Sequence, residues 1–237
     1  MNDYIRTNNL VGSVVGLTVS SSNQSNSFGD AIKISLMIKK TNKIDDKKIF
    51  KHPKSTGFKI STSGKIKDIF KQSLEIALSV ATQHLCTIDY KKYKNFFINN
   101  EIHFHLPDML VEKDGPSAGI ALYLCAMSIA LNKPLRNNLA LTGEIAYDGS
   151  VLKIGGVRQK CQGALRYNIK HIILPIGNKE DFEKLPNDMK NLFENVYFVS
   201  NYLQVYNIAF EMDEMNDCKY YKIEDNIEMG DNSFMKL

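Results

Sequence analysis

The sequence predicts a mixed α/β fold, α+β in character, in which helices pack on one sheet in a single compact domain. Short stretches rich in β-branched residues predict strands, and a long stripe of apolar residues at helical spacing predicts a helix between them. The second half of the chain then alternates strand-like and helix-like segments. Together these observations are typical of a sheet covered by several helices.

The first half begins with two strand-like segments, residues 10–19 and 31–38, bounded by Ser, Asn, Gly and Asp. We expect these two strands to pair. Residues 39–57 are rich in Lys and have few apolar side chains, which favours a solvated loop insertion over a binding patch. Apolar residues at three- and four-residue intervals over 66–85 then predict an amphipathic helix, and alternation over 101–106 predicts a strand.

The second half opens with a nearly all-apolar helix, expected from Ser117 to Leu131 and stopped by Asn132 and Pro134. The segments after it are predicted as a strand at 138–141, a turn at 147–150, a strand at 151–154, a helix at 157–167, a strand at 171–174, a helix at 179–185, a strand at 195–199 and a helix at 202–210. The domain is therefore expected to span 10–210, after an N-terminal extension at 1–9. The acidic, Asn- and Met-rich tail at 211–237 is expected to be disordered.

The composition excludes several classes of protein. A chain of 237 residues with 43% apolar and 24% charged residues can bury a core. Its net charge of +4 is spread without a dominant basic stripe, which does not favour nucleic acid as the main partner. The four cysteines lie far apart and outside any zinc-ligand spacing, so neither a metal site nor a disulfide framework is indicated. The longest apolar stretch, 118–131, is shorter than the roughly 18 residues that a membrane span needs.

Ser117 is a candidate nucleophile. The segment KDGPSAG at 113–119 places it at a helix start, after a Gly-Pro pair that forces a tight turn. Free backbone N–H groups in a first helical turn could stabilise the oxyanion of an acyl-transfer transition state. The alternative is that Ser117 only caps the helix, and the spacing by itself does not decide between the two.

Lys160 is a candidate general base. The helix from Val157 turns one face inward, and its inward positions are Val157, Lys160, Cys161, Ala164 and Leu165. Burial lowers the pKa of an ammonium group, and a neutral lysine can take the proton from a serine. The alternative is that Lys160 extends its long stem to solvent.

Four segments carry a resemblance to a known family: VEKDGPSAG at 111–119, LTGE at 141–144, IGGVRQK at 154–160 and NKEDFEKLP at 178–186. They closely resemble the proteolytic domain of Lon proteases, and the resemblance extends over about 10–210. That family carries its nucleophile in a D-G-P-S-A-G motif and its base on the last lysine of an I-G-G-x-K-x-K motif. Ser117 and Lys160 occupy these positions, so the resemblance implies a serine-lysine dyad that hydrolyses peptide bonds.

The resemblance also implies roles for neighbours of the dyad. Thr142 resembles the family threonine whose hydroxyl lies near the catalytic lysine, although a plain strand-end threonine is the alternative reading. Asp114, Gly115 and Pro116 are expected to shape the turn before the nucleophile rather than to transfer protons.

His103 and His105 form a further candidate pair. Residues two apart on a strand share a side, so the two imidazoles are expected on one face. They resemble a paired histidine feature upstream of the family's active site, and we expect them near the dyad rather than in it. Satisfied core histidines are the alternative.

The expected cofactors and partners also follow from the resemblance. No G-x-x-x-x-G-K-[ST] phosphate loop occurs in the sequence, so ATP and magnesium are expected only for the ATPase portion of Lon-like chains, and neither cofactor nor metal for this domain. The expected partners are unfolded polypeptides and further copies, in a hexameric ring of the full-length protein, without a membrane. Residues 39–57 and 136–140 resemble mitochondrial Lon, which predicts the mitochondrial matrix, with another organellar or a bacterial soluble compartment as the alternative.

Two other functions stay open at this point. The chain could be a catalytically silent ring-assembly module of the same fold, in which Ser117 caps a helix and Lys160 reaches solvent. It could also be a nucleic-acid-binding module, which its dispersed charge does not favour.

Overall fold

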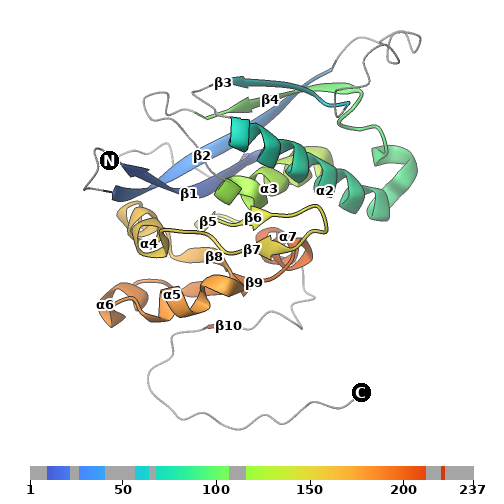
Figure 1. Ribbon diagram of the computed structural model, residues 1–237. Coiled ribbons are helices and arrows are strands. Elements are labelled where there is room, and N and C mark those ends of the chain that lie inside the picture. Colours follow the sequence, from blue (N-terminus) through green and yellow to red (C-terminus); the bar gives the residue numbers. More distant parts are fainter. Residues whose placement is uncertain are drawn as a thin grey trace, which may run out of the picture.

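A mixed sheet with helices on both faces organises the chain (Figure 1). The computed structural model describes residues 10–21, 27–40, 57–63, 68–106, 116–211 and 220–221. The strands are β1 (Ser13–Ser21), β2 (Ser27–Lys40), β3 (Lys59–Ser63), β4 (Asn100–His105), β5 (Leu139–Leu141), β6 (Glu144–Ile145), β7 (Val151–Leu152), β8 (His171–Pro175), β9 (Asn195–Val199) and β10 (Tyr220–Tyr221). The helices are α2 (Asp68–Tyr93), α3 (Gly119–Leu131), α4 (Val157–Arg166), α5 (Lys179–Glu183), α6 (Asn187–Lys190) and α7 (Tyr202–Phe210), with the 3-10 turns η2 (Pro116–Ala118) and η3 (Ile176–Asn178).

The strand order explains how distant segments meet. Within the described residues the sheet has the order β10-β9-β8-β5-β1-β2-β4-β3, while β6 and β7 form a separate hairpin. β1 and β2 pair antiparallel, which confirms the predicted pairing of the first two strands. β5 lies parallel to both β1 and β8, so an early strand and two late strands are neighbours in the middle of the sheet. This arrangement confirms the mixed α/β fold class.

The two faces of the sheet bury separate cores. Along β8, Ile173 packs into the core formed with α2, α3 and α7, whereas Ile172 and Leu174 pack into the core formed with α4 and the α5–α6 region. This alternation follows from the period of two in a strand. α3 is buried on nearly all sides between α2 and the sheet, which accounts for its apolar composition.

Several elements differ from the sequence prediction. The short elements β6, α6 and β10 were not predicted, and α3 begins at Gly119 rather than at Ser117, after the 3-10 turn η2. α2 continues past residue 85 to Tyr93, with a non-helical break at Asp89 (φ −154°, ψ 98°). β3 was not predicted, because KISTS contains a single large apolar residue, yet it pairs parallel with β4 over its whole length. The strand predicted at 151–154 ends at Leu152.

Parts of the predicted domain organisation lie outside the described residues. These parts are the extension at 1–9 and residues 41–56 of the Lys-rich insertion. The first two residues of the insertion, 39–40, are described and form the end of β2. In the tail, 212–219 and 222–237 are also outside, whereas Tyr220–Tyr221 form β10 against β9. The domain boundaries therefore stay predictions.

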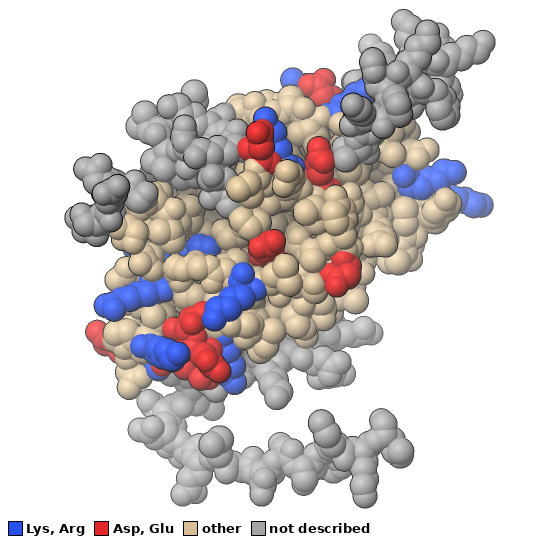
Figure 2. Space-filling view, viewed as in Figure 1, with Lys and Arg blue, Asp and Glu red and all other residues tan. Residues whose placement is uncertain are grey.

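The surface carries charges of both signs. Figure 2 shows Lys, Arg, Asp and Glu side chains mixed over the α5–α6 region. Ion pairs there join Lys153 to Asp181 at 3.1 Å and Lys179 to Glu183 at 3.7 Å. Among the described residues, no helix has both the length and the apolar character needed to cross a bilayer.

Candidate active site

Ser117 lies in η2, the 3-10 turn that leads into α3. Its carbonyl oxygen accepts two hydrogen bonds, from Gly143 N at 2.9 Å and from Thr142 Oγ1 at 3.1 Å. Both donors belong to the segment between β5 and β6. The turn is therefore held against the end of an inner strand, while Ser117 itself stays half-buried.

The start of α3 packs closely on the backbone of β6. A Cβ added to Gly119 would lie 2.6 Å from Ile145 N, so only glycine fits at this contact. The cap position of α3 is Ala118, and no side chain caps the helix. Ser117 is therefore not the N-cap, which removes one of the two readings of this serine.

One expected oxyanion donor is already occupied. The N–H of Ile120, in the first turn of α3, donates to Gly143 O at 3.1 Å. That bond ties the helix start to the same β5–β6 segment that holds Ser117. The expectation of free first-turn N–H groups beside the nucleophile is therefore wrong for Ile120.

Lys160 is buried on the inner face of α4, with 3% of its surface exposed. Val157, Cys161 and Ala164 are buried on the same helix, and Leu165 is partly buried, so four of the five predicted inward positions are fully buried. Lys160 does not extend to solvent. Burial lowers the pKa of the Lys160 ammonium from 10.5 to about 8. A substantial fraction of this amine is therefore neutral at mildly alkaline pH.

Thr142 connects Lys160 to the turn that contains Ser117. Lys160 Nζ donates to Thr142 Oγ1 at 2.9 Å, and Thr142 Oγ1 donates to Ser117 O. Thr142 is fully buried, and its N–H donates to Ile173 O of β8 at 3.2 Å. The threonine hydroxyl thus both accepts and donates a hydrogen bond. The backbone bond to β8 fixes the position of Thr142.

The helix that carries Lys160 lies unusually close to β2. A Cβ on Gly29 would fall 1.5 Å from Gln159 O, and a Cβ on Gly163 would fall 2.7 Å from Asp30 N. Glycine on both elements lets the two backbones approach. Sequence reasoning missed this contact, since nothing in the local pattern relates Gly29 to a helix so much later in the chain.

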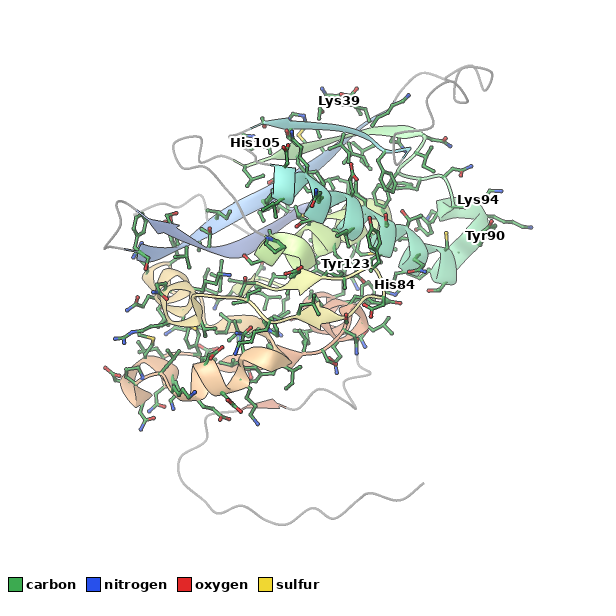
Figure 3. All side chains as sticks on the ribbon, viewed as in Figure 1. Lys39, His84, Tyr90, Lys94, His105 and Tyr123 are labelled. Carbon is green, nitrogen blue, oxygen red and sulfur yellow. The ribbon has the colours of Figure 1, made fainter. Side chains whose placement is uncertain are left out.

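The histidine pair lies on β4 and bonds to serines of β3. His103 Nδ1 lies 2.9 Å from Ser61 Oγ, and Ser63 Oγ lies 3.3 Å from His103 Nε2 and 2.7 Å from His105 Nδ1. Figure 3 labels His105 on this outer part of the sheet. The two histidines share a face, as predicted, and their recorded hydrogen bonds go to these serines. Their proximity to the dyad stays a prediction.

The residues before Ser117 are only partly described. Pro116 begins η2, and its role in shaping the turn stays a prediction. Asp114 and Gly115 lie outside the described residues. The structure thus brings together Ser117, Thr142 and Lys160 from the predicted set.

Comparison with known proteins identifies relatives of this chain. A Lon protease homolog, mitochondrial, from Phaeodactylum tricornutum is 41% identical over 154 residues, which cover 65% of this chain and 17% of that protein. The mitochondrial Lon protease homolog of Drosophila melanogaster is 39% identical over 159 residues, 67% of this chain and 15% of that protein. Lon protease homolog 1, mitochondrial, of Arabidopsis thaliana is 37% identical over 158 residues, 67% of this chain and 16% of that protein. The chain spans less than a fifth of the length of these curated relatives.

The family model gives the broader assignment. The model described as the Lon protease (S16) C-terminal proteolytic domain matches residues 48–212, more than half of the chain. Ser117, Thr142 and Lys160 all lie inside the matched region. The chain therefore belongs to the Lon protease (S16) C-terminal proteolytic domain family.

Proposed function

We propose that this domain hydrolyses peptide bonds with Ser117 as nucleophile and Lys160 as general base. The observation that carries the proposal is the buried Lys160 amine, whose pKa of about 8 leaves part of it neutral near physiological pH. Its hydrogen bond to Thr142 holds the amine beside the turn that bears Ser117. A base with a pKa close to the working pH is suited to proton transfer.

The reaction proceeds through an acyl-enzyme. Neutral Lys160 Nζ takes the proton from Ser117 Oγ, which bonds to the scissile carbonyl carbon while the π electron pair moves to the carbonyl oxygen. The C–N bond then breaks as the oxyanion collapses, and the leaving amine takes the proton from the Lys160 ammonium. A water molecule, deprotonated by Lys160, attacks the ester and releases the acid, with the proton returning to Ser117 Oγ.

The proposal requires an approach between two atoms during the reaction. The Lys160 amine bonds to Thr142, so Ser117 Oγ has to come within hydrogen-bond reach of Nζ when a substrate binds. Catalytic hydrogen bonds in free enzymes are commonly long and tighten in the substrate complex. Thr142 fixes one of the two partners in advance.

We extend the proposal to the biological setting. The substrates are unfolded or damaged polypeptides, degraded by an ATP-dependent Lon-type protease whose proteolytic domains meet in a hexameric ring. ATP and magnesium act in an ATPase portion, whereas the chemistry derived for this domain uses only its own side chains. The compartment we propose is the mitochondrial matrix, and the word mitochondrial in the names of the relatives supports the organelle. The mixed charges over α5 and α6 give no support for a nucleic-acid partner (Figure 2).

The test of the dyad is peptide hydrolysis together with covalent labelling. Purified chain is incubated with a fluorogenic unfolded peptide and, separately, with a fluorophosphonate, and the labelled residue is located by mass spectrometry. We expect hydrolysis and labelling of Ser117, and loss of both in Ser117→Ala. The melting temperature of that variant should stay near that of wild type, because Ser117 does not cap α3. A folded wild-type chain that shows neither reaction would be a silent ring-assembly module.

The same chain tests the proposed division of labour with ATP. We expect it to cleave the peptide at one rate with or without ATP and magnesium, and to leave a stably folded reporter intact. A folded protein with a stability of roughly 5–15 kcal/mol exposes its backbone too rarely for unaided cleavage. Loss of the reporter that depends on ATP would show that this chain itself drives unfolding.

A further inference from the structure

Asn178 is a fully buried polar residue at the end of η3. Its side chain forms three hydrogen bonds: Oδ1 accepts from Ile154 N at 2.9 Å, and Nδ2 donates to Ile154 O at 2.8 Å and to Asp181 Oδ2 at 2.8 Å. Two of these bonds pair the N–H and the C=O of Ile154 with the side-chain amide of Asn178, as a neighbouring β-strand would pair them. An amide in this position is matched atom by atom to Ile154.

The residue that Asn178 holds lies just before the helix that carries Lys160. Gly155 and Gly156 separate Ile154 from α4, and Gly156 adopts a left-handed φ of 71° as the N-cap. No side chain caps α4. Two consecutive glycines have the greatest backbone freedom of any pair, so they do not fix the direction of the helix. Its direction depends on the packing of α4 against β2 and on where the preceding segment is held. Ile154, two residues before the N-cap of α4, is the nearest preceding residue whose backbone is bonded to a side chain.

A backbone hydrogen bond ties Lys160 to the Gly155–Gly156 segment that follows Ile154. In the first turn of α4, Lys160 N donates to Gly156 O at 2.9 Å, so the base moves with the segment that precedes the helix. A shift at this segment would carry Lys160 Nζ away from Thr142, which the sheet holds independently. Misplacement of a catalytic group by about 1 Å can cost about 100-fold in rate.

Asp181 and Lys153 help to hold the side-chain amide of Asn178 in place. Asp181 accepts from Asn178 and pairs with Lys153 Nζ at 3.1 Å. The hydrogen bonds from Asn178 and Lys153 lower the pKa of the Asp181 carboxyl, so it stays an acceptor at neutral pH. Lys153 immediately precedes Ile154, so this ion pair holds the same segment that Asn178 holds.

We propose that Asn178 is a positioning residue for catalysis. Its hydrogen bonds to the backbone of Ile154 help to fix the start of α4 and so maintain the hydrogen bond between Lys160 Nζ and Thr142 Oγ1. The inference rests on the proposed role of Lys160 as general base. The side-chain hydrogen bonds of Asn178 go to Ile154 and Asp181 and not to Ser117, Thr142 or Lys160. Its replacement should therefore affect turnover and the titration of Lys160 without changing substrate binding.

The test compares Asn178→Ala and Asn178→Asp with wild type in the full chain. Asn178→Asp is close in shape, but it turns both donated bonds into oxygen–oxygen contacts. For both variants we expect kcat to fall about 10- to 100-fold with KM within about twofold of wild type. The pH midpoint of kcat/KM should also rise above the wild-type value, because a displaced Lys160 amine is better hydrated. The neighbouring Cys161 thiol, whose pKa burial raises to about 12, stays uncharged over this range.

Two controls separate positioning from general stability. Asn201 caps α7 by accepting from Gln204 N at 3.1 Å, and Asn201→Ala should lower the melting temperature while leaving kcat and the pH midpoint unchanged. The exchange Asn178→Asp with Asp181→Asn removes one of the two repulsive contacts, so it should recover part of the kcat lost in Asn178→Asp. If Asn178→Ala does not fold, Asp181→Asn, which weakens one of the three bonds, should shift kcat and the pH midpoint in the same direction by a smaller factor.

The outcomes distinguish this inference from the proposed function. Folded Asn178 variants with kcat within about twofold of wild type and an unshifted midpoint would overturn it. A loss of kcat that only follows the fraction of folded protein would overturn it as well. Failure of the proposed function has a different signature: either the wild-type chain shows no hydrolysis, or Lys160→Arg keeps the wild-type activity whatever the Asn178 variants do.

Discussion

Lys160 Nζ lies 2.9 Å from Thr142 Oγ1, and both side chains are buried. A hydroxyl can accept a hydrogen bond from either the ammonium or the neutral amine, but it does not offset a buried charge as a carboxylate would. The partner therefore orients the lysine while burial keeps its pKa low. This combination is what a lysine needs in order to act as a base.

Replacement of Thr142 tests this orienting role. Thr142→Val keeps the shape but removes the hydroxyl, so we expect peptide hydrolysis to fall about 10- to 100-fold and stability to fall by about 1–2 kcal/mol. Thr142→Ser keeps the hydroxyl and should retain most of the activity. Initial rates and urea unfolding of both variants provide the measurement, and equal activity of the two variants would contradict the role.

The pH dependence of activity should report the titration of Lys160. Below pH 8 the folded protein holds this lysine mostly protonated, so kcat/KM for an unfolded peptide should rise with pH through a midpoint of about 8. Lys160→Arg should be inactive at every workable pH, because a guanidinium does not deprotonate. A pH–rate profile of both proteins is sufficient, and a flat wild-type profile between pH 7 and 9 would argue against a lysine base.

Removal of the buried amine should stabilise the fold near neutral pH. The pKa of Lys160 is about 8 in the folded chain against 10.5 unfolded, so the unfolded state binds more protons between these values and stability rises with pH across them. Below pH 8 the whole penalty is present, at about 3 kcal/mol. Lys160→Met should thus be more stable than wild type at pH 7 by about 1–3 kcal/mol, after allowance for the lost hydrogen bond. Urea unfolding should show this difference shrinking as pH approaches 10.5.

A second buried pair sets the acid limit of stability. His84 on α2 and Tyr123 on α3 form a 2.7 Å hydrogen bond within the core formed with α2, α3 and α7 (Figure 3). Tyr202 and Tyr206 also contact the imidazole there. Burial lowers the pKa of His84 from 6.5 to about 4, so the unfolded state binds more protons between these values. Stability should be full above pH 6.5 and fall by about 3 kcal/mol as pH drops to 4.

His84→Gln isolates that contribution from other groups. The glutamine amide can still bond to Tyr123 but does not titrate. The unfolding free energy of the variant should therefore decrease less than that of wild type between pH 7 and pH 4.5. Parallel urea titrations at the two pH values measure the difference. An identical loss in both proteins would assign the acid sensitivity elsewhere, for instance to His171, whose pKa burial also lowers.

The close contact of β2 with α4 predicts a sharp difference between two glycines. Gly29→Ala would place a methyl group 1.5 Å from Gln159 O, so backbone has to move and stability should fall by about 3 kcal/mol or more. Gly155→Ala is the matched control, because a Cβ there meets nothing within 4 Å and the φ of Gly155 is not left-handed. Its unfolding free energy should stay within about 0.5 kcal/mol of wild type in thermal or urea denaturation. Equal effects of the two changes would show that the contact is not tight.

Local periodicity was sufficient for much of this protein. The stripe over 66–85 identified α2, and the inward positions counted from Val157 correctly placed Lys160 inside. β9 and α7 were predicted to the residue, at 195–199 and 202–210. These predictions succeed because a helix or strand presents its side chains at a fixed period, whatever it packs against. The same reasoning missed β3, whose polar segment forms a strand only because β4 pairs with it.

The contacts that make a site were decided by the tertiary structure. Lys160 meets Thr142 because β5 ends beneath α4, and Gly29 meets Gln159 because β2 passes the same helix. Each contact joins residues whose separation in the chain bears no relation to a helical or strand period. It depends on the order of strands in the sheet, and long-range pairing sets that order. The amino-acid sequence alone therefore determined which elements form and which residues face inward, whereas only the folded sheet determined which of those residues touch.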